Sequence, residues 1–389
     1  MLLYSDNLKE SSTLRINSIA NQKKNNGEKV YNFSVGEPVI ENHALIVEGV
    51  CNALKRNRTQ YPPVAGINEL LRLCADWMNT NYNCSYNSQE TMVTCGGKYG
   101  IFLALQALLD VGDEVVIISP YWVSYPEMIK IFHGIPRVYT TKEESDWRVD
   151  AMELQKLINK KTKAIIINNA SNPTGHIFSK QELVDILEMA HDQSIFVISD
   201  EVYSGLVYEY NQFISAGSFA EFKDKVIIIQ SCSKNFGMTG WRVGMIFGPQ
   251  EIVKCLAVIQ SQSITNTSIV SQWAAITAIQ NADTITGEVR KIVQGRRDVF
   301  VRVFNELFSE KIKAPQSSLY CFVSLKKMGV FGKNADEFSA DLIEQANIAL
   351  TSGGGFGDDN YVRFSFGISE AEIIDGLRVL KNFTENKKF

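Results

Sequence analysis

Lys234 stands where a lysine could act as a nucleophile rather than as a surface charge. It closes the segment Ser231-Cys232-Ser233-Lys234, which follows the β-branched run Val226–Ile229 after a single residue, Gln230. A strand of this kind would aim the lysine into a cleft, where burial lowers the pKa of the amine and favours attack on a carbonyl carbon. Because a lone lysine is usually a solvated charge, the hypothesis depends on the neighbouring strand ends.

Three other β-branched runs are also followed by polar and aromatic residues, which are costly to bury without partners. Asp200 could be a helix cap or an ion-pair partner, or a carboxylate that keeps a ring nitrogen protonated. Since ligands bind beyond the carboxyl ends of the strands in an open parallel sheet, four such ends together predict a site. The three segments are Ser119–Trp122, Asn168–Gly175 and Ser199–Tyr203.

Gly96 and Gly97 stand directly before the predicted helix Lys98–Leu109. Free backbone N–H groups at such a helix start suit an anion such as a phosphate, although a plain strand-to-helix turn has the same pattern. Arg242, in the segment Gly240–Gly244, offers a cation shortly after Lys234. Neither a P-loop nor a GxGxxG sequence is present, so the common nucleotide fingerprints are missing.

Short β-branched runs alternate with helical patterns such as Asp150–Ile158 and Ser179–His191 through the middle of the chain. This order predicts an α/β fold with a mostly parallel sheet between helices. From Gly287 onward the pattern changes to a smaller α+β unit with a long helix Gly287–Ser309. We expect three parts: residues 1–40 packing with the small domain, a large domain over 41–285, and a small C-terminal domain over 286–389.

Composition is that of a soluble globular protein, with 389 residues, 45% apolar residues, 21% charged residues and a net charge of −4. Disorder and phosphate-driven nucleic-acid binding are therefore excluded. The seven cysteines include no CxxC pair and the four histidines are scattered, so we expect a reducing cytoplasm and no metal site. The N-terminus has no signal-peptide pattern, and polar residues interrupt the longest uncharged stretch, so we expect no membrane span.

Taken together, these motifs resemble the class I/II aminotransferases of pyridoxal-phosphate fold type I. The subgroup that the chain is most similar to is the bacterial aspartate aminotransferases. The resemblance implies a large domain with a seven-stranded sheet and a smaller α+β domain. The matching segments occur in family order: Ser34–Pro38, Tyr61–Gly66, Gly96–Lys98, Ser119–Pro126, Asn172–Gly175, Ser199–Tyr203, Ser231–Lys234, Gly240–Gly244 and Tyr361–Ser365.

The resemblance implies a role for each residue around the ring of the cofactor. Lys234 would bind pyridoxal 5′-phosphate covalently and then move the substrate proton as general base and acid. Asp200 would pair with the ring nitrogen of the cofactor and keep the ring an electron sink. Tyr203 and Asn172 would hydrogen-bond the ring oxygen, and Trp122 would stack on the ring face.

The resemblance also assigns the phosphate and the substrate groups. Backbone N–H groups of Gly97 and Lys98, the Ser231 hydroxyl and Arg242 would hold the phosphate. Tyr61 would reach it from the other subunit, which implies a homodimer with shared sites.

Arg363 would grip the substrate α-carboxylate with a planar fork, and Gly36 would add a backbone N–H. Trp122 and Asn172 would also face the substrate. Lys98, with Thr13 in the segment Ser11–Leu14, would receive the distal carboxylate of aspartate or glutamate.

The resulting hypothesis is a pyridoxal-phosphate-dependent aminotransferase that moves the amino group of an acidic amino acid to a 2-oxo acid by a ping-pong mechanism. Aromatic or prephenate-type substrates and a lyase of the same fold remain alternatives. Val39-Ile40 and Ala170 depart from the usual family pattern, and the first pair loosens the substrate assignment. The sequence shows neither the helix-turn-helix extension of a transcription factor with an aminotransferase-like domain nor the glycine fingerprint of a nicotinamide dehydrogenase.

Overall fold

The structure is a computed structural model that describes residues 8 and 10–387. Its centre is a seven-stranded sheet in which only β8 runs antiparallel to its neighbours. The inner parallel strands β3, β5, β6 and β7 are buried on both faces, which explains their unbroken apolar runs. In spatial order the strands are β2 (Thr91–Thr94), β8 (Gly244–Phe247), β7 (Val226–Ser231), β6 (Phe196–Asp200), β5 (Thr162–Asn168), β3 (Glu114–Ser119) and β4 (Ile135–Thr140).

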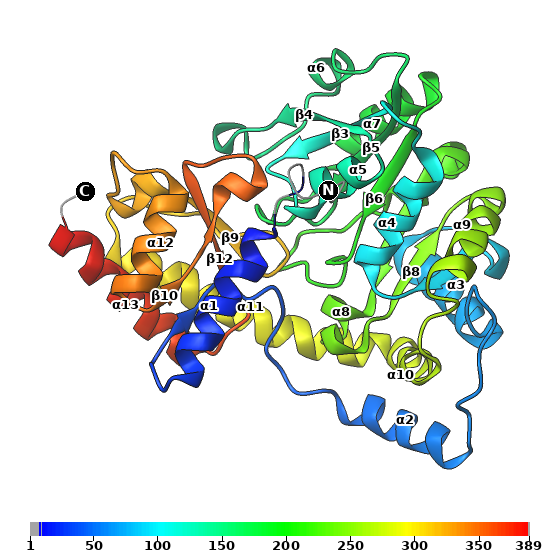
Figure 1. Cartoon of the computed structure of the whole chain (residues 1–389), viewed down its shortest axis with the longest axis horizontal. Helices are drawn as coiled ribbons and strands as arrows, with labels where there is room; N and C mark the ends of the chain where they lie inside the picture. The colour runs from blue at the N-terminus through cyan, green and yellow to red at the C-terminus, as the bar shows by residue number, and fades with distance from the viewer. Residues whose placement is uncertain (1–7, 9, 388–389) are drawn as a thin grey trace, which may run out of the picture.

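Helices cover both faces of this sheet (Figure 1), and the buried apolar residues form two large clusters. Ser179 caps α7 with a capping box, as its spacing with Glu182 predicts. The predicted helix at 150–158 is shorter than expected, because it ends at Gln155. The helices of this part are α2 (Ala44–Lys55), α3 (Asn68–Tyr82), α4 (Gly97–Leu108), α5 (Ser124–Ile131), α6 (Ala151–Gln155), α7 (Lys180–Asp192), α8 (Cys232–Asn235), α9 (Gln250–Ser263) and α10 (Ile269–Gln280).

The C-terminal elements form a second, smaller group around a three-stranded antiparallel sheet in the order β11-β12-β9. Figure 1 shows them gathered beside α1 at one end of the molecule, and strand β1 pairs in parallel with β10. These elements are α1 (Ser12–Asn25), β1 (Tyr31–Asn32), β9 (Tyr320–Ser324), α12 (Ala335–Gln345), β10 (Ile348–Ala349), β11 (Thr351–Ser352), β12 (Tyr361–Ser365) and α13 (Glu370–Lys387).

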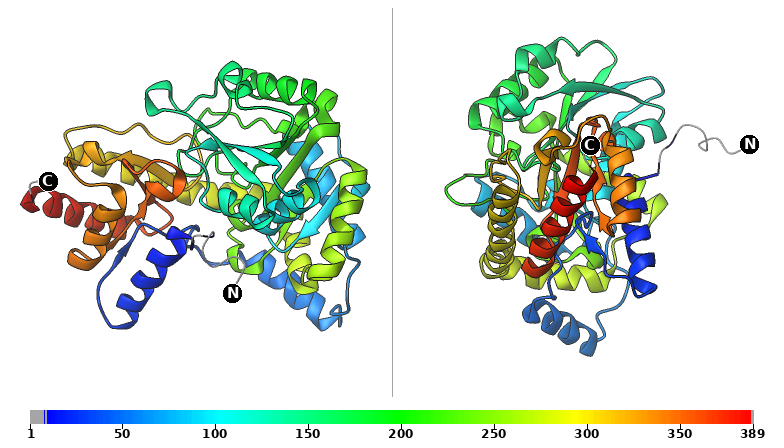
Figure 2. Two further views of the ribbon diagram at one scale, coloured as in Figure 1. Left: turned by 45° about the horizontal axis from the view of Figure 1, so that its top comes forward. Right: turned by 90° about the vertical axis from the view of Figure 1, so that its left-hand side faces the viewer.

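Helix α11 (Ala282–Leu307) joins the two groups as one continuous element (Figure 2). It begins five residues earlier than the charged pattern suggests, so the expected boundary at 285 lies inside a helix. The division of the chain at 40 and 285 stays a prediction. Part of the expected N-terminal segment, residues 1–7 and 9, lies outside the described residues. No helix in the described part of the chain has both the length and the apolar character of a membrane span.

Candidate active site

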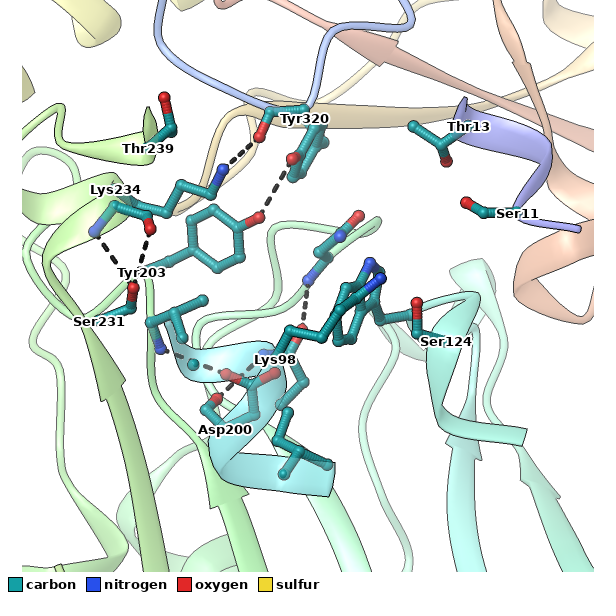
Figure 3. Close-up of a pocket in the computed structure, with 18 of the residues that line it drawn as sticks. Ser11, Thr13, Lys98, Ser124, Asp200, Tyr203, Ser231, Lys234, Thr239 and Tyr320 are labelled. Carbon is teal, nitrogen blue, oxygen red and sulfur yellow. Dashed lines mark hydrogen bonds between the residues drawn. The ribbon is translucent and has the colours of Figure 1, made fainter. Parts of the chain in front are cut away.

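A cavity of about 340 Å³ opens where the strands of the large sheet end (Figure 3). This volume is typical of sites for small molecules. Every residue that the sequence assigns to the site lines it, except Tyr61. These residues are Thr13, Gly36, Gly97, Lys98, Trp122, Asn172, Asp200, Tyr203, Ser231, Lys234, Arg242 and Arg363.

Lys234 enters the cavity from the short helix α8, which follows β7 directly. Its Nζ donates a hydrogen bond to the carbonyl oxygen of Gly36. Burial lowers the pKa of the Lys234 ammonium, while the acidic groups of Tyr320 and Glu37 oppose that shift. A lowered pKa brings a larger fraction of the amine into its neutral, nucleophilic form at neutral pH.

Asp200 closes β6 and is buried at the bottom of the same cavity. Burial raises the pKa of its carboxyl to about 6, and hydrogen bonds from Tyr125 and Val202 together with the charge of Lys234 act against that rise. The phenol of Tyr125 donates to Asp200 Oδ2 at 2.6 Å. A buried carboxylate in this state gains from a cationic or N–H partner in the cavity.

An anion cradle forms where β2 leads into α4. Gly96 has φ of +82° and is the N-cap of α4, and the first two residues of the helix, Gly97 and Lys98, line the cavity. A side chain at Gly96 would place its Cβ 2.5 Å from Arg242 Nη2, so glycine is needed for the guanidinium to approach. The Ser231 hydroxyl lies on the same wall and donates to the Val243 carbonyl at 3.1 Å.

Arg363 is a buried cation without a carboxylate partner among the described residues. It is 1% exposed, and burial lowers the pKa of its guanidinium. Its Nη1 donates to Asn172 Oδ1 at 3.2 Å and its Nη2 to the Ser34 carbonyl at 3.1 Å, but its buried Nε has no partner. Because an unpaired buried charge is unstable, this group is arranged to receive an anion such as a carboxylate.

Lys98 brings a further cation to the same cavity. The Lys98 ammonium lies 4.9 Å from the centre of the Trp122 ring. Burial, and then the charge of Arg242, lower the pKa of Lys98. The Thr13 hydroxyl, on the wall of the same cavity, is buried and has no hydrogen-bond partner. Lys98 and Thr13 could therefore hold a second anionic group of a ligand that Arg363 grips at its other end.

Two tyrosines that sequence reasoning left without a role belong to the site. Tyr125 supports Asp200 from α5, and Tyr320 lies on β9 with its hydroxyl 3.1 Å from that of Tyr203. Tyr125 lies in the segment Ser119–Pro126 that carries the family resemblance, but its contact with Asp200 could not be predicted from that segment. No comparable signal exists for Tyr320, because it reaches the site from the other structural group.

Tyr61 lies outside the cavity, and its side chain is 91% exposed. Its predicted contact with the phosphate comes from a second subunit, so a single chain does not test it. The role stays a prediction.

Comparison with known proteins agrees with this geometry. The family model described as aminotransferase class I and II matches residues 28–380. A probable aspartate/prephenate aminotransferase of Aquifex aeolicus is 34% identical over 97% of both chains. The aspartate aminotransferase of Bacillus subtilis is 31% identical, also over 97% of both.

Among solved structures, the aspartate aminotransferase of Thermus thermophilus with maleate superposes with a TM-score of 0.93 at 30% identity, covering 98% of this chain and 99% of that one. The predicted α/β fold with a mostly parallel seven-stranded sheet is thereby confirmed as fold type I. A family match over most of the chain and relatives that are similar along their whole length show that this protein belongs to the class I and II aminotransferases.

Proposed function

We propose that the protein transfers amino groups with pyridoxal 5′-phosphate, by a ping-pong mechanism between an amino acid and a 2-oxo acid. The observation that carries the proposal is that the Lys234 amine and the Asp200 carboxylate line one cavity beside the anion cradle at Gly97. When bound, this cofactor supplies an aldehyde and a ring that accepts electrons from the substrate Cα–H bond.

The residues present fit this cofactor group by group. The N-terminus of α4 and the guanidinium of Arg242 suit a phosphate monoester. The buried carboxylate of Asp200 suits a protonated ring nitrogen, because a cationic partner offsets the cost of burying the charge. Trp122 supplies an aromatic face on the wall of the cavity.

Each side chain then has a defined task. Asp200 would keep the ring nitrogen protonated, and Lys234 would take the proton from the substrate Cα and return it at the former aldehyde carbon of the cofactor. Asn172 Oδ1 accepts from Arg363, which leaves the Asn172 amide N–H free to donate to the ring oxygen together with Tyr203. Arg363 fixes the α-carboxylate, so that the Cα–H bond stands perpendicular to the ring.

The direct test is a visible spectrum of the purified protein with pyridoxal 5′-phosphate. We expect an absorbance band of the protein-bound cofactor that shifts when aspartate is added and returns when 2-oxoglutarate follows. A protein that never develops the band, or whose band does not respond to any amino acid, contradicts the proposal. Ammonia release without an acceptor would instead indicate a lyase.

For the substrate we propose aspartate or glutamate as donor and 2-oxoglutarate as an acceptor. Lys98 and Thr13 offer a cation and a free hydroxyl on the cavity wall, and Arg363 offers a second cation. Two anionic ligand groups are needed to match them. Prephenate is a second candidate, because the relative from Aquifex aeolicus is named for both substrates.

Lys98→Gln tests this assignment, since it removes the charge but keeps the backbone N–H in the anion cradle. We expect kcat/KM for aspartate to fall roughly 10- to 100-fold, mainly through KM, because a charge-assisted hydrogen bond is lost. Activity with alanine, which has no distal carboxylate, should change less than about threefold. Lys254→Gln, at an exposed lysine paired with Glu251, is the matched control. Equal losses for aspartate and alanine would mean that Lys98 does not bind the distal carboxylate.

We also propose that the active unit is a homodimer. Helix α2 lies at the edge of the molecule (Figure 2) and exposes Leu45, Val47 and Leu54. Beside the mouth of the cavity lies an apolar hollow lined by residues that include Tyr99, Phe102 and Ile264. We expect these exposed apolar residues to lie in the subunit interface.

Mixed dimers test whether Tyr61 acts across that interface. Lys234→Ala and Tyr61→Ala homodimers should each have low activity. A heterodimer of the two should recover roughly half of the wild-type activity, because one of its two sites carries neither change. Heterodimers isolated with two different affinity tags give the measurement. If mixing recovers nothing, Tyr61 serves its own chain. Full activity in the Tyr61→Ala homodimer would instead mean that Tyr61 serves no site.

A further inference from the structure

Tyr320 connects two groups that have separate tasks in the proposed function. It lies on β9, is 1% exposed, and reaches across from the smaller structural group into the cavity. Its ring lies over the guanidinium of Arg363, and its hydroxyl points at the hydroxyl of Tyr203 (Figure 3). No other residue described in the structure makes both contacts.

The ring contact constrains the plane of the arginine. Arg363 Cζ lies 4.1 Å from the centre of the Tyr320 ring and 5.0 Å from that of Phe356. A guanidinium stacked on aromatic rings has few orientations open to it, and a bidentate grip on a carboxylate needs one orientation. The Tyr320 ring therefore serves ligand binding.

The hydroxyl contact acts on the other end of the site. The Tyr203 and Tyr320 oxygens are 3.1 Å apart. If Tyr203 donates its only proton to the ring oxygen of the cofactor, its own oxygen is left as an acceptor, and Tyr320 is placed to donate to it. Two hydroxyls in series polarise one another and strengthen the terminal hydrogen bond.

We propose that Tyr320 is a positioning residue with two separable parts: its ring orients Arg363 for the substrate carboxylate, and its hydroxyl holds Tyr203 against the cofactor oxygen. The inference rests on the proposed function. One side chain outside the large sheet, Tyr320, would thus link the residue that binds the substrate to the residue that binds the cofactor.

Two substitutions at the same position separate the parts. Tyr320→Phe keeps the ring and removes the hydroxyl, whereas Tyr320→Leu removes both. Tyr361→Phe is the matched control, because it removes a tyrosine hydroxyl from the adjacent strand, where that hydroxyl contacts Glu143 at 3.1 Å outside the cavity. Thermal melting of each variant shows whether it folds.

The readouts are binding of a non-reacting dicarboxylate, maleate, measured by calorimetry, and the pH at which the visible absorbance of the cofactor-loaded protein titrates. Tyr320→Phe should bind maleate within about twofold of wild type while the spectral midpoint rises by about one pH unit. Tyr320→Leu should also weaken maleate binding roughly tenfold. The titratable groups facing Tyr203 besides Tyr320 are Arg363, Asp200 and Tyr125, with Lys234 on the same cavity wall. None of them is changed in these variants.

The outcomes separate a failure of the proposed function from a failure of the role of Tyr320. If the wild-type protein shows no cofactor band, the proposed function fails. If it shows one and Tyr320→Phe titrates like wild type and like Tyr361→Phe, only the role of the hydroxyl is overturned. Equal maleate affinity in Tyr320→Leu and wild type overturns the role of the ring.

Discussion

Replacing Lys234 with Ala should abolish transamination, with a loss of at least roughly 10³- to 10⁴-fold in kcat. The variant loses the amine that binds the cofactor and the only general base we assign at the substrate Cα. Other groups in the cavity, such as Tyr203, carry a pKa raised by burial and cannot take over that proton at neutral pH. Single-turnover assays with aspartate, followed by the visible spectrum, measure the loss.

The fold should survive this substitution. Lys234 lies on the short helix α8. The core packing of this segment comes from Cys232 and Phe236, which are both almost fully buried, so it does not depend on the lysine side chain. Circular dichroism and the thermal midpoint should therefore stay close to wild type. Lys254→Ala, at an exposed lysine on α9, is the control. Normal turnover in the folded Lys234→Ala protein would refute the assigned role.

The sheet could be predicted from sequence where its strands are buried on both faces. The runs before Ser119, Asn168, Asp200 and Ser231 all became parallel strands with those residues at their ends. Strand β4 was missed because it lies at the edge of the sheet and is largely exposed, so it has no continuous apolar run. Strand β8 was missed because its four residues begin with a glycine.

The candidate site divides in the same way. Motif residues such as Lys234 and Arg363 could be placed because each belongs to a recognisable segment. The hydrogen-bond partners that reach the site from distant parts of the chain could not be predicted from sequence. Tyr203 and Tyr320 are separated by 117 positions, and Tyr125 and Asp200 by 75, so only folding brings each pair together. The partner-subunit role of Tyr61 depends on an assembly that one chain does not contain.

Asp200→Asn should lower kcat by roughly 10²- to 10³-fold, because a neutral amide no longer holds a proton on the ring nitrogen. Tyr125 can still donate to the amide oxygen, so the geometry of the pair is kept. Asp185→Asn, at a carboxylate on α7 bonded to Gln181 at 2.7 Å, is the matched control. Wild-type turnover in Asp200→Asn would remove the carboxylate from the mechanism.

The same substitution should stabilise the cofactor-free protein above pH 6. Burial raises the pKa of Asp200 from 3.8 to about 6, so the folded state binds this proton more tightly than the unfolded state. The resulting stability is full below pH 3.8 and is lost as the pH rises through about 6. Ionised Asp200 then costs about 3 kcal/mol of folding free energy in the absence of a cationic ligand.

Asparagine carries no such cost. Glu201, whose pKa burial raises to about 7, adds to the effect in the same direction, because the charge of Asp200 contributes to that rise and is absent from Asp200→Asn. The thermal midpoint of cofactor-free Asp200→Asn should therefore exceed that of wild type by a few degrees at pH 8 and by less at pH 4.5. Adding pyridoxal 5′-phosphate should reverse the order at pH 8, since only the carboxylate gains a cationic partner. A midpoint difference that is independent of pH would mean that Asp200 is ionised without cost, and that its burial does not prepare the site for a cationic ring.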